Sequence, residues 1–204
     1  MTIISIEGNI GSGKSTLLKH LSKTYPDIVT VQEPVDEWAK IRDPDGKTVL
    51  ELYYSDQNKW AFAFQMMAFI TRVRKLREAV ENNPDKLVVT ERSVFTDRNI
   101  FAMMLHDSGI MNDVEYAIYT QWFDELTNGI KIDKVVYVRT EPTECEWRIK
   151  CRSRPGENIP PEYLVSCHEY HEQWLRAYDD KLVLNGELTT EEMFEKLKPF
   201  LQRS

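Results

Sequence analysis

The sequence predicts an α/β fold in which helices cover both faces of a five-stranded parallel sheet. Three observations lead to this class. Short apolar runs alternate with longer stretches of helical periodicity, which is typical of parallel strands joined by helices. The length of 204 residues suits one domain. No internal repeat or low-complexity linker divides the chain, so we expect a single domain over residues 1–204.

The expected elements alternate in chain order, beginning with a strand. The stretch Trp60–Ile70 is apolar nearly all round, so we expect its helix to be buried on more than one side. Asp43–Lys47 and Asn82–Asp85 read as turns between elements rather than domain boundaries. The expected strands are Ile3–Ile6, Ile28–Gln32, Leu87–Thr90, Lys134–Val138 and Lys181–Leu184. The expected helices are Lys14–Thr24, Val49–Ser55, Gln57–Asn82, Val94–Asp107, Asp113–Asn128, Pro142–Cys151, Pro161–Asp180 and Thr190–Leu201.

The bulk composition narrows the class of function. A net charge of −7 argues against a nucleic acid polymer as partner, because binding a phosphate backbone needs a basic surface. No run approaches the roughly 18 apolar residues of a membrane span. The segment Thr2–Glu7 reads as a strand leading into a motif, which leaves no room for a targeting peptide, and the cysteines read as reduced thiols. We therefore expect a cytoplasmic protein without a membrane partner.

A glycine-rich segment after the first strand fits the phosphate-binding pattern G-x-x-x-x-G-K-[ST], the P-loop, at every fixed position. Its glycines let backbone N–H groups converge on phosphates, and the following helix adds its dipole. Lys14 of such a loop reaches the β- and γ-phosphates of a nucleoside triphosphate, and the Ser15 hydroxyl is a ligand of Mg²⁺. The expected phosphate-binding residues are Gly8, Asn9, Ile10, Gly11, Ser12, Gly13, Lys14, Ser15 and Thr16.

A P-loop alone does not separate a kinase from a GTPase switch or a mechanical ATPase. The guanine-selecting pattern N-K-x-D is absent, because Asn58-Lys59 is followed by Trp60-Ala61. Asp43–Gly46 matches D-x-x-G formally, but it follows no apolar strand. A P-loop nucleotide-binding switch therefore stays as the weaker alternative.

Charged residues stand at the ends of the second and third strands. Glu33 follows the second strand, and a carboxylate at this edge of an α/β sheet can accept a proton from an attacking hydroxyl group. Glu91 and Arg92 follow the third strand, in a place that suits metal and phosphate contacts. The residues alone leave two alternatives open, a solvated charge at Glu33 and a structural ion pair between Glu91 and Arg92.

Arginines are dense just before the break Pro155-Gly156. Arg148 and Arg152 are four residues apart, so they share one face of a helix. With Arg154 they predict a mobile lid, at about residues 152–159, that brings cations to a transferring phosphoryl group. A charged surface helix is the alternative.

These motifs together resemble those of the deoxynucleoside kinases, from residue 1 to about residue 180. The resemblance implies a P-loop kinase fold with an Arg-rich lid and a homodimeric enzyme of nucleotide salvage. It implies transfer of the γ-phosphoryl group of ATP, or another nucleoside triphosphate, with Mg²⁺, to the 5′-hydroxyl of a deoxynucleoside. The residues that carry it are Gly8–Thr16, Glu33-Pro34-Val35, Trp38, Trp60, Phe64-Gln65, Glu91-Arg92-Ser93, the arginine segment, and Ile159-Pro160 with Tyr163-Leu164.

The resemblance also implies a role for each matching residue. Glu33 is the general base for the 5′-hydroxyl group with Arg92 beside it, and Glu91 joins Ser15 at the Mg²⁺ site. Gln65 hydrogen-bonds the edge of the base. The catalytic set is Lys14, Glu33, Arg92, Arg152 and Arg154; Arg148 and Arg152 contact the triphosphate, Phe101 stacks on the base, Tyr54 and Glu157 hold the sugar 3′-hydroxyl, and Val35, Trp38, Tyr53 and Phe64 complete the pocket.

Within the family, Ala68, Arg72 and Asp97 match the deoxycytidine and deoxyguanosine kinase branch. Arg72 follows Gln65 by two helical turns, so both can point into one pocket, and Asp97 can pair with Arg72. The Asp97 carboxylate suits the exocyclic amine of cytosine or adenine. Arg72 can instead donate to a carbonyl oxygen such as that of guanine, so guanine stays a candidate base. We expect deoxycytidine or a purine deoxynucleoside to be preferred. The alternatives are a thymidine-preferring kinase, a nucleoside monophosphate kinase, and a purely structural Arg72–Asp97 pair.

Three features depart from that branch. Tyr53 stands where a methionine is usual, which can narrow the base pocket. The lid segment Arg152–Asn158 is one residue shorter and resembles that of the herpesvirus thymidine kinases, so the register of Glu157 stays open. The tail after Leu184 is short, and the sequence does not define the contacts of the adenine.

Overall fold

The computed structural model describes residues 2–154 and 157–202, and its centre is a five-stranded sheet in the order β2-β3-β1-β4-β5. All four strand pairings are parallel, and every residue of the central strand β1 is buried. The predicted α/β class is confirmed. The strands are β1 (Ile3–Glu7), β2 (Val29–Val31), β3 (Val88–Glu91), β4 (Lys134–Arg139) and β5 (Lys181–Asn185).

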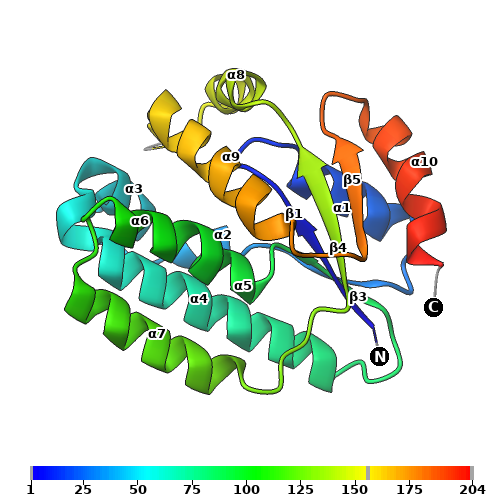
Figure 1. Ribbon diagram of the computed structural model, residues 1–204, viewed down its shortest axis with the longest axis horizontal. Coiled ribbons are helices and arrows are strands. Elements are labelled where there is room, and N and C mark those ends of the chain that lie inside the picture. The colour runs from blue at the N-terminus through cyan, green and yellow to red at the C-terminus, as the bar shows by residue number, and fades with distance from the viewer. Residues whose placement is uncertain (1, 155–156, 203–204) are drawn as a thin grey trace.

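Helices alternate with the strands and surround the sheet (Figure 1). Within the described ranges, none of them is long and apolar enough to cross a membrane. Capping boxes, in which the first side chains of a helix satisfy its free N–H groups, begin α3, α7 and α10. The helices are α1 (Lys14–Thr24), α2 (Val35–Trp38), α3 (Val49–Ser55), α4 (Gln57–Glu81), α5 (Val94–Thr96), the π-helix η1 (Asp97–Ala102), α6 (Met103–Asp107), α7 (Asp113–Thr127), α8 (Pro142–Arg152), α9 (Pro161–Leu175) and α10 (Thr190–Leu201).

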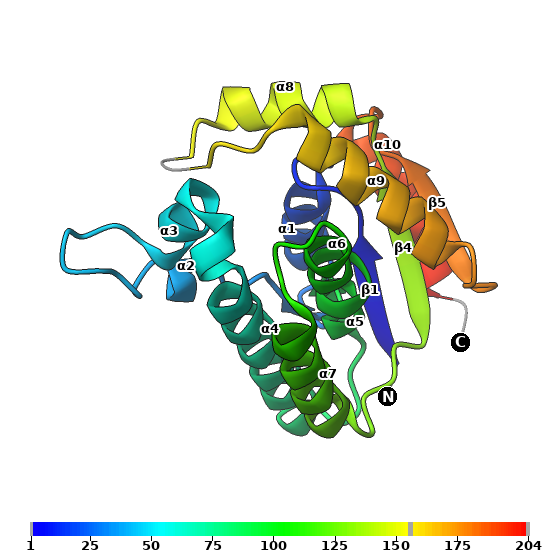
Figure 2. The same cartoon turned by 60° about the vertical axis from the view of Figure 1, so that its left-hand side comes forward.

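One face of the sheet is covered by α1 and α10, and Figure 2 shows the strands between α10 and α9. Ile4 and Ile6 of β1 point to this face, because alternate residues of a strand face opposite sides. They form one apolar cluster with Leu17 of α1 and Phe194 of α10. This packing fixes α1, and the loop that precedes it, against the end of β1.

The opposite face is covered by α4 and α9, with the segment α5-η1-α6 between them, and α7 packs against α4 and η1. Phe69 of α4 packs against Phe123 of α7. Leu76, two turns further along α4, packs against Val88 of β3. The helix α4 is therefore buried on more than one side, as its apolar stretch predicts.

The carboxyl ends of the parallel strands meet at one edge of the sheet, and α3 and α8 lie beyond that edge (Figure 2). Cys145 and Ile149 of α8 pack against Leu164 of α9, and Ile10 of the P-loop joins the same cluster. The P-loop is thus held between the sheet, α8 and α9.

The structure differs from the sequence predictions at three places. The helix expected over Val94–Asp107 contains the π-helical turn η1, whose wider hydrogen-bonding ring leaves no local sequence signal. The helix expected over Pro161–Asp180 ends at Leu175, because the following residues turn the chain into β5. The short helix α2 was not expected. The other helix and strand ends lie within one residue of their predicted positions.

Candidate active site

A cavity of about 650 Å³ lies at the carboxyl edge of the sheet, lined by residues of α3 and α8 among others. We call the part formed by the P-loop and α8 the P-loop end, and the part beside Gln65 of α4 the Gln65 end. Every residue expected to contact an acceptor molecule lines this cavity, namely Glu33, Val35, Trp38, Tyr53, Tyr54, Phe64, Gln65, Ala68, Arg72, Arg92, Asp97, Phe101 and Glu157.

The P-loop joins β1 to α1 through a backbone conformation that favours glycine. Gly8 has a φ of 144°, and a Cβ atom there would lie 2.5 Å from the carbonyl oxygen of Val138. Lys14 begins α1, and its Nζ donates a hydrogen bond to the carbonyl oxygen of Asn9 at 2.6 Å. Of the predicted phosphate-binding residues, Ile10, Gly11, Gly13, Lys14, Ser15 and Thr16 line the cavity.

Gly8, Asn9 and Ser12 are not among the lining residues and instead shape the loop from behind. The Asn9 amide donates to the carbonyl oxygen of Leu164 at 2.8 Å, which ties the loop to α9. The Ser12 carbonyl oxygen accepts a hydrogen bond from the Thr140 hydroxyl at 3.1 Å. The loop is therefore supported by two elements distant in sequence.

The Lys14 ammonium group lies at the bottom of the P-loop end, and the residue is only 4% exposed. Burial, together with the positive charge of Arg92, lowers the pKa of Lys14 to about 7. A phosphate group beside this nitrogen would favour its charged form. Lys14 is thus poised to be protonated when an anion arrives.

Ser15 and Glu91 bring two oxygen groups together beside Lys14. The Ser15 hydroxyl donates a hydrogen bond to Oε1 of Glu91, and both residues line the cavity. Among the described residues, no group of three or more His, Cys, Asp or Glu side chains is arranged to hold a metal ion. A hard cation at Ser15 and Glu91 would therefore need further oxygen ligands, such as those of a phosphate chain.

Arg92 directly follows β3 in a strained conformation, with a φ of 61°. Its backbone N–H remains in the sheet pattern, donating to the Ile6 carbonyl oxygen at 2.9 Å. The side chain, now turned into the cavity, donates through Nη1 to the Gly8 carbonyl oxygen at 2.8 Å. Its Nε lies 3.5 Å from Oε1 of Glu33, and its guanidinium lies 5.0 Å from the centre of the Phe101 ring.

Glu7, which the sequence analysis did not single out, holds this turn in place. The fully buried carboxylate accepts hydrogen bonds from the Ser93 N–H at 2.8 Å and from the Thr96 hydroxyl. These contacts fix the chain directly after the strained Arg92 and within α5. The signal was available, since an acidic residue ends a strand whose other residues are apolar or small.

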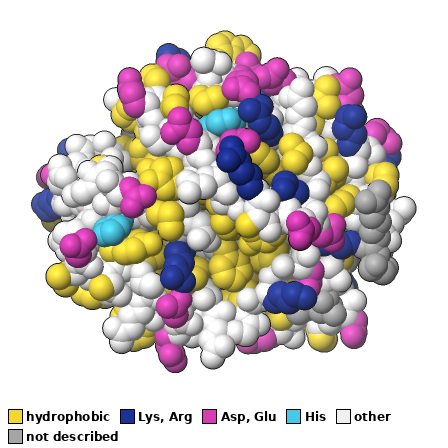
Figure 3. Space-filling model, in the orientation of Figure 1, with side chains coloured by type: hydrophobic (Ala, Val, Ile, Leu, Met, Phe, Trp, Pro, Cys, Tyr) yellow, Lys and Arg dark blue, Asp and Glu magenta, His cyan; other side chains and the backbone are white. Residues whose placement is uncertain are grey.

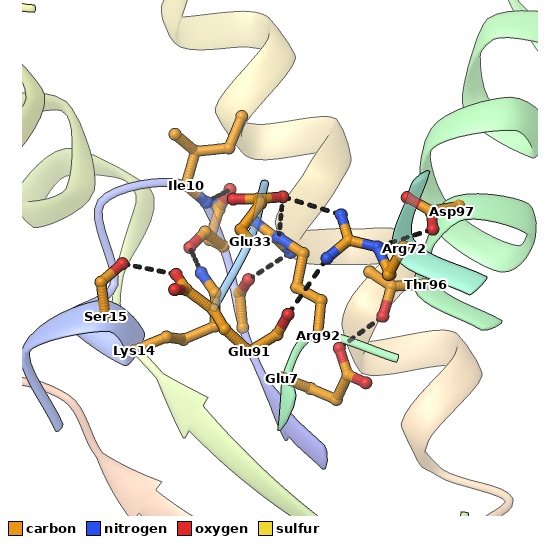
Figure 4. Close-up of polar contacts among 12 residues, drawn as sticks. Glu7, Ile10, Lys14, Ser15, Glu33, Arg72, Glu91, Arg92, Thr96 and Asp97 are labelled. Carbon is orange, nitrogen blue, oxygen red and sulfur yellow. Dashed lines mark hydrogen bonds and ion pairs between the residues drawn. The ribbon is translucent and has the colours of Figure 1, made fainter. Parts of the chain in front are cut away.

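Arg72 of α4 is the centre of the Gln65 end (Figure 4). Its Nε donates to Oδ2 of Asp97 at 2.8 Å, and its Nη2 donates to Oε1 of Glu33 at 2.8 Å. Its Nη1 donates to the backbone carbonyl oxygen of Glu91 at 3.1 Å. The expected pairing of Arg72 with Asp97 is confirmed, whereas the bond to Glu33 was not foreseen.

The environment sets the charges of this cluster. Burial alone would raise the pKa of Glu33, but Arg72 and Arg92 outweigh it and lower that pKa to about 2. Burial raises the pKa of the Asp97 carboxyl above its usual range, although Arg72 opposes the change. Burial also acts against the charge of Arg72, but Asp97 and Glu33 raise the pKa of its guanidinium, so it stays charged.

The wall of the Gln65 end is aromatic with one unpaired polar atom. Oε1 of Gln65 is buried and has no hydrogen-bond partner among the described residues. The Tyr53 ring stacks on Phe64 with ring centres 4.5 Å apart, and its hydroxyl lies 3.0 Å from the hydroxyl of Tyr163. Because an unpaired buried acceptor is costly, Gln65 marks a place where a ligand would donate a hydrogen bond.

The arginines of α8 reach the cavity from above the P-loop. Arg148 donates to the Ser12 carbonyl oxygen at 3.3 Å, and Arg152 pairs with Glu157 at 2.6 Å. Arg154 lies 3.7 Å from the same carboxylate. The expected break at Pro155-Gly156 lies outside the described residues. Glu157 is thus engaged by arginines in this structure, rather than free to contact a hydroxyl group.

A further wall of the P-loop end could not be defined from the sequence. It is formed by Gly186, Leu188, Thr189, Thr190 and Met193, where β5 passes into α10. The Gly186 N–H donates to the Arg139 carbonyl oxygen at 2.8 Å, and a Cβ atom at Gly186 would lie 1.9 Å from Oγ1 of Thr140. The glycine after the last strand was the available signal.

The outer surface carries charges of both signs. On the face shown in Figure 3, basic and acidic side chains are interspersed. The described residues that line the cavity also include both signs, with seven Lys and Arg side chains against five Asp and Glu side chains. The cavity of this acidic protein therefore has a small excess of positive charge, where a small anion could bind.

The matches to known proteins include the residues that line both ends of this cavity. A sequence model described as "Deoxynucleoside kinase" matches residues 4–199. The chain is 41% identical over 175 residues to the probable deoxycytidine kinase of Fowlpox virus, covering 84% of this chain and 71% of the relative. It is 35% identical over 193 residues to deoxycytidine kinase of Homo sapiens, covering 84% and 74%. It is 31% identical over 214 residues to the mitochondrial deoxyguanosine kinase of Xenopus laevis, covering 96% and 77%.

Proposed function

The chain belongs to the deoxynucleoside kinase family, and from that premise we propose how its cavity acts and which base it prefers. The protein is a phosphotransferase that takes a phosphoryl group from a nucleoside triphosphate to a deoxynucleoside, a reaction of nucleotide salvage. We infer that the donor is ATP and that the preferred acceptor is deoxycytidine or a purine deoxynucleoside. One domain over residues 1–204, with a lid at about residues 152–159, carries the reaction.

One observation carries this proposal. A single cavity has the P-loop cations at one end and both the unpaired amide oxygen of Gln65 and the buried Asp97 at the other, with Glu33 between the two ends. A triphosphate at the P-loop end and a nucleoside at the Gln65 end would meet at Glu33. Trp38 and Tyr54 line the sugar region, and they suit a neutral nucleoside better than a monophosphate.

At the P-loop end, the triphosphate is held by Lys14 and by the backbone of the loop. Lys14 neutralises the charge that develops on the transferring group, and Arg152 and Arg154 add positive charge from the lid. Ser15 and Glu91 supply oxygen ligands of the kind that Mg²⁺ prefers, and their mutual hydrogen bond keeps them within reach of one ion. When bound, Mg²⁺ would offset phosphate charge there.

In the reaction, Glu33 orients the 5′-hydroxyl group and accepts its proton. Its low pKa makes it a weak base, which suits a phosphoryl transfer in which positioning and charge stabilisation supply most of the rate. Arg92 lies between Glu33 and the P-loop, where it can contact the transferring group. Phe101 and Phe64 enclose the base, and Glu157 with Tyr54 reaches the sugar once the lid arginines engage phosphate.

The base preference rests on Asp97 and Gln65. A carboxylate accepts hydrogen bonds, so Asp97 suits the exocyclic amine of cytosine or adenine and opposes the carbonyl oxygen of thymine. The relatives named deoxycytidine kinase and deoxyguanosine kinase support this preference over thymidine. Ala68, which faces the same end, leaves room for the base.

We further propose that the protein is a homodimer. Val114, Ile118 and Trp122 form a stripe along α7 and are 69%, 40% and 51% exposed, with Ile70 of the neighbouring α4 40% exposed. An exposed apolar stripe on packed helices is typical of a subunit interface. Analytical ultracentrifugation tests this, since the sedimenting mass of a single chain contradicts it. The interspersed charges of Figure 3 suit small-molecule partners better than a nucleic acid polymer.

A panel of deoxynucleosides at equal concentration with ATP and Mg²⁺ tests the preference. We expect deoxycytidine or a purine deoxynucleoside to exceed thymidine by at least about tenfold in kcat/KM, the ratio that ~1.4 kcal/mol gives. Thymidine proving the best substrate contradicts the preference and leaves the family assignment intact.

A further inference from the structure

We propose that Arg72 is a positioning residue that fixes which oxygen of Glu33 accepts the proton of the acceptor hydroxyl group, and that it does so through the same guanidinium that Asp97 holds beside the base. The inference rests on the proposed function, in which Glu33 is the general base. It assigns to Arg72 a part in the chemical step besides its place in the base pocket.

The two oxygens of Glu33 are not equivalent. Oε1 accepts a hydrogen bond from Nη2 of Arg72 at 2.8 Å and lies 3.5 Å from Nε of Arg92. No hydrogen bond or ion pair from the described residues reaches Oε2. Figure 4 shows both guanidinium groups converging on the same oxygen. Oε2 is therefore the atom free to face the hydroxyl group.

Arg72 has little freedom to give up this contact. Its side chain is 3% exposed, and its guanidinium donates in three directions, to Asp97, Glu33 and the backbone of Glu91. Such a fork needs the planar geometry of arginine, because a single ammonium group cannot span both carboxylates. Asp97, at the first position of the π-helix η1, holds the Nε side of the fork.

The proton transfer then follows from the geometry. The 5′-oxygen forms a bond to the γ-phosphorus as its O–H bond breaks, and the proton passes to Oε2 of Glu33. The bond from the γ-phosphorus to the β–γ bridging oxygen breaks, and its electron pair leaves with the diphosphate. Oε1 keeps its hydrogen bond to Arg72 throughout, so the carboxylate does not rotate. A nucleobase that moves the Asp97 side chain also moves the Arg72 guanidinium, and through it changes the orientation of Glu33.

A double-mutant cycle tests this coupling. The paired change Arg72→Met with Asp97→Asn removes the fork without stranding a buried charge. With the best nucleoside of the panel, we expect a loss of at least about tenfold in the single-turnover rate. Made in the Glu33→Gln background, the same pair should change that rate by less than about twofold, because Arg72 acts through Glu33. Equal losses in both backgrounds overturn the inference.

Two further comparisons separate positioning from a structural role. Asp97→Asn alone keeps an acceptor for Nε of Arg72, so its loss in rate should be smaller than that of Asp97→Ala. Arg72→Lys keeps the positive charge but loses the guanidinium fork that donates to both carboxylates. This variant takes the place of the paired variant if the pair does not fold. We expect Arg72→Lys to lose rate more than nucleoside affinity; a loss of affinity alone overturns the inference.

The pH profile gives an independent readout. In the Asp97→Asn variant, which has no titratable group at position 97, the rate should stay level on the acid side, because the pKa of Glu33 is held near 2. Adding Arg72→Met to this variant should bring an acid limb above about pH 4, and an unchanged profile counts against the inference. The charged and titratable groups that face Glu33 are Arg72 from α4, Arg92 after β3, Lys14 from α1, Asp97 from η1 and Tyr54 from α3.

The Glu33→Gln variant tests the proposed function as well as this inference. If Glu33→Gln lowers only nucleoside affinity, the general-base role in the proposed function fails and this inference falls with it. If Glu33→Gln lowers the rate but the cycle is additive, the inference fails alone.

Discussion

The phosphate-binding loop at the P-loop end is the backbone of one contiguous segment, residues 8–16, whereas the Gln65 end is shaped by side chains from elements far apart in the sequence. Arg72 meets Glu33 across 39 residues and Asp97 across 25. At the P-loop end, the corresponding contact of Lys14 with Asn9 spans only 5 residues. The two ends therefore depend on different kinds of sequence information.

This difference has a functional consequence. Backbone N–H groups bind any phosphate chain in the same way, so the P-loop end fixes the reaction and is indifferent to the acceptor. In the proposed function, side chains such as Gln65, Asp97 and Tyr53 present particular atoms to a base, so the Gln65 end would fix the choice of acceptor. Substitutions at the two ends should therefore change different kinetic quantities.

The largest effect is expected from Lys14→Ala. Loss of a cation that stabilises transition-state charge should lower kcat by at least about 10²-fold, and by the same factor for every deoxynucleoside. Steady-state kinetics across the panel measures this. Lys23→Ala, in the exposed last turn of the same helix, is the matched control. A folded Lys14→Ala variant that keeps more than about a tenth of the rate would remove the support for the P-loop assignment.

A second prediction concerns the backbone itself. Gly8→Ala should lower the free energy of unfolding by about 2–4 kcal/mol, because the new Cβ atom meets the Val138 carbonyl oxygen and the φ is strained. Gly109→Ala is the control, since Gly109 has a φ of 74° but open space around its Cβ position. It should cost about 1 kcal/mol. Urea unfolding compares the two, and equal costs would show that crowding at Gly8 is unimportant.

The Gln65 end offers a smaller effect that changes selectivity rather than rate. Tyr53→Met should raise kcat/KM for purine deoxynucleosides relative to deoxycytidine by about five- to tenfold, because the stacked ring no longer fills the base pocket. Tyr53→Phe removes only the hydroxyl that faces Tyr163 and should leave this ratio nearly unchanged. The same shift in both variants would mean that the hydroxyl pair, not the ring, sets the pocket.

The smallest effect is a proton taken up on binding. With a pKa of about 7, Lys14 is mostly neutral at pH 8, and an anionic phosphate raises that pKa, so binding should consume nearly one proton. Titration calorimetry at pH 8, with a non-hydrolysable triphosphate in buffers of different ionisation enthalpy, measures the number. Lys14→Arg stays charged and should take up almost none. No difference between the two proteins would contradict the lowered pKa.

The sequence predicted the backbone shape of residues 8–16 well, because that shape is determined locally. Residues 8–16 bring their own turn and helix start, so their pattern alone implies their shape. The wall at Leu188–Met193 was not predicted, because it depends on where β5 and α10 pack against the P-loop. The order of strands and helices followed from the alternating apolar pattern, which survives without any knowledge of distant contacts.

At the Gln65 end, the participating side chains could be named, but their partners could not. Nothing near Arg72 in the sequence indicates that its guanidinium reaches Glu33 as well as Asp97. The sequence did not predict the π-helix η1 or the role of Glu7 for the same reason, since both depend on hydrogen bonds made after the sheet and α4 have packed. Resemblance to a family identified the residues; only the structure gave their connections.

The position of the wall at residues 186–193 has a consequence for how the protein is made. A ribosome completes the P-loop well before it adds this wall, at about 5–20 residues per second. A bound nucleotide stabilises only states that can hold it. A bound nucleoside triphosphate can therefore protect the chain from unfolding once β5 and α10 have docked, but it offers little protection to a nascent chain that ends before Gly186. During synthesis, the early segments must rely on their own apolar contacts.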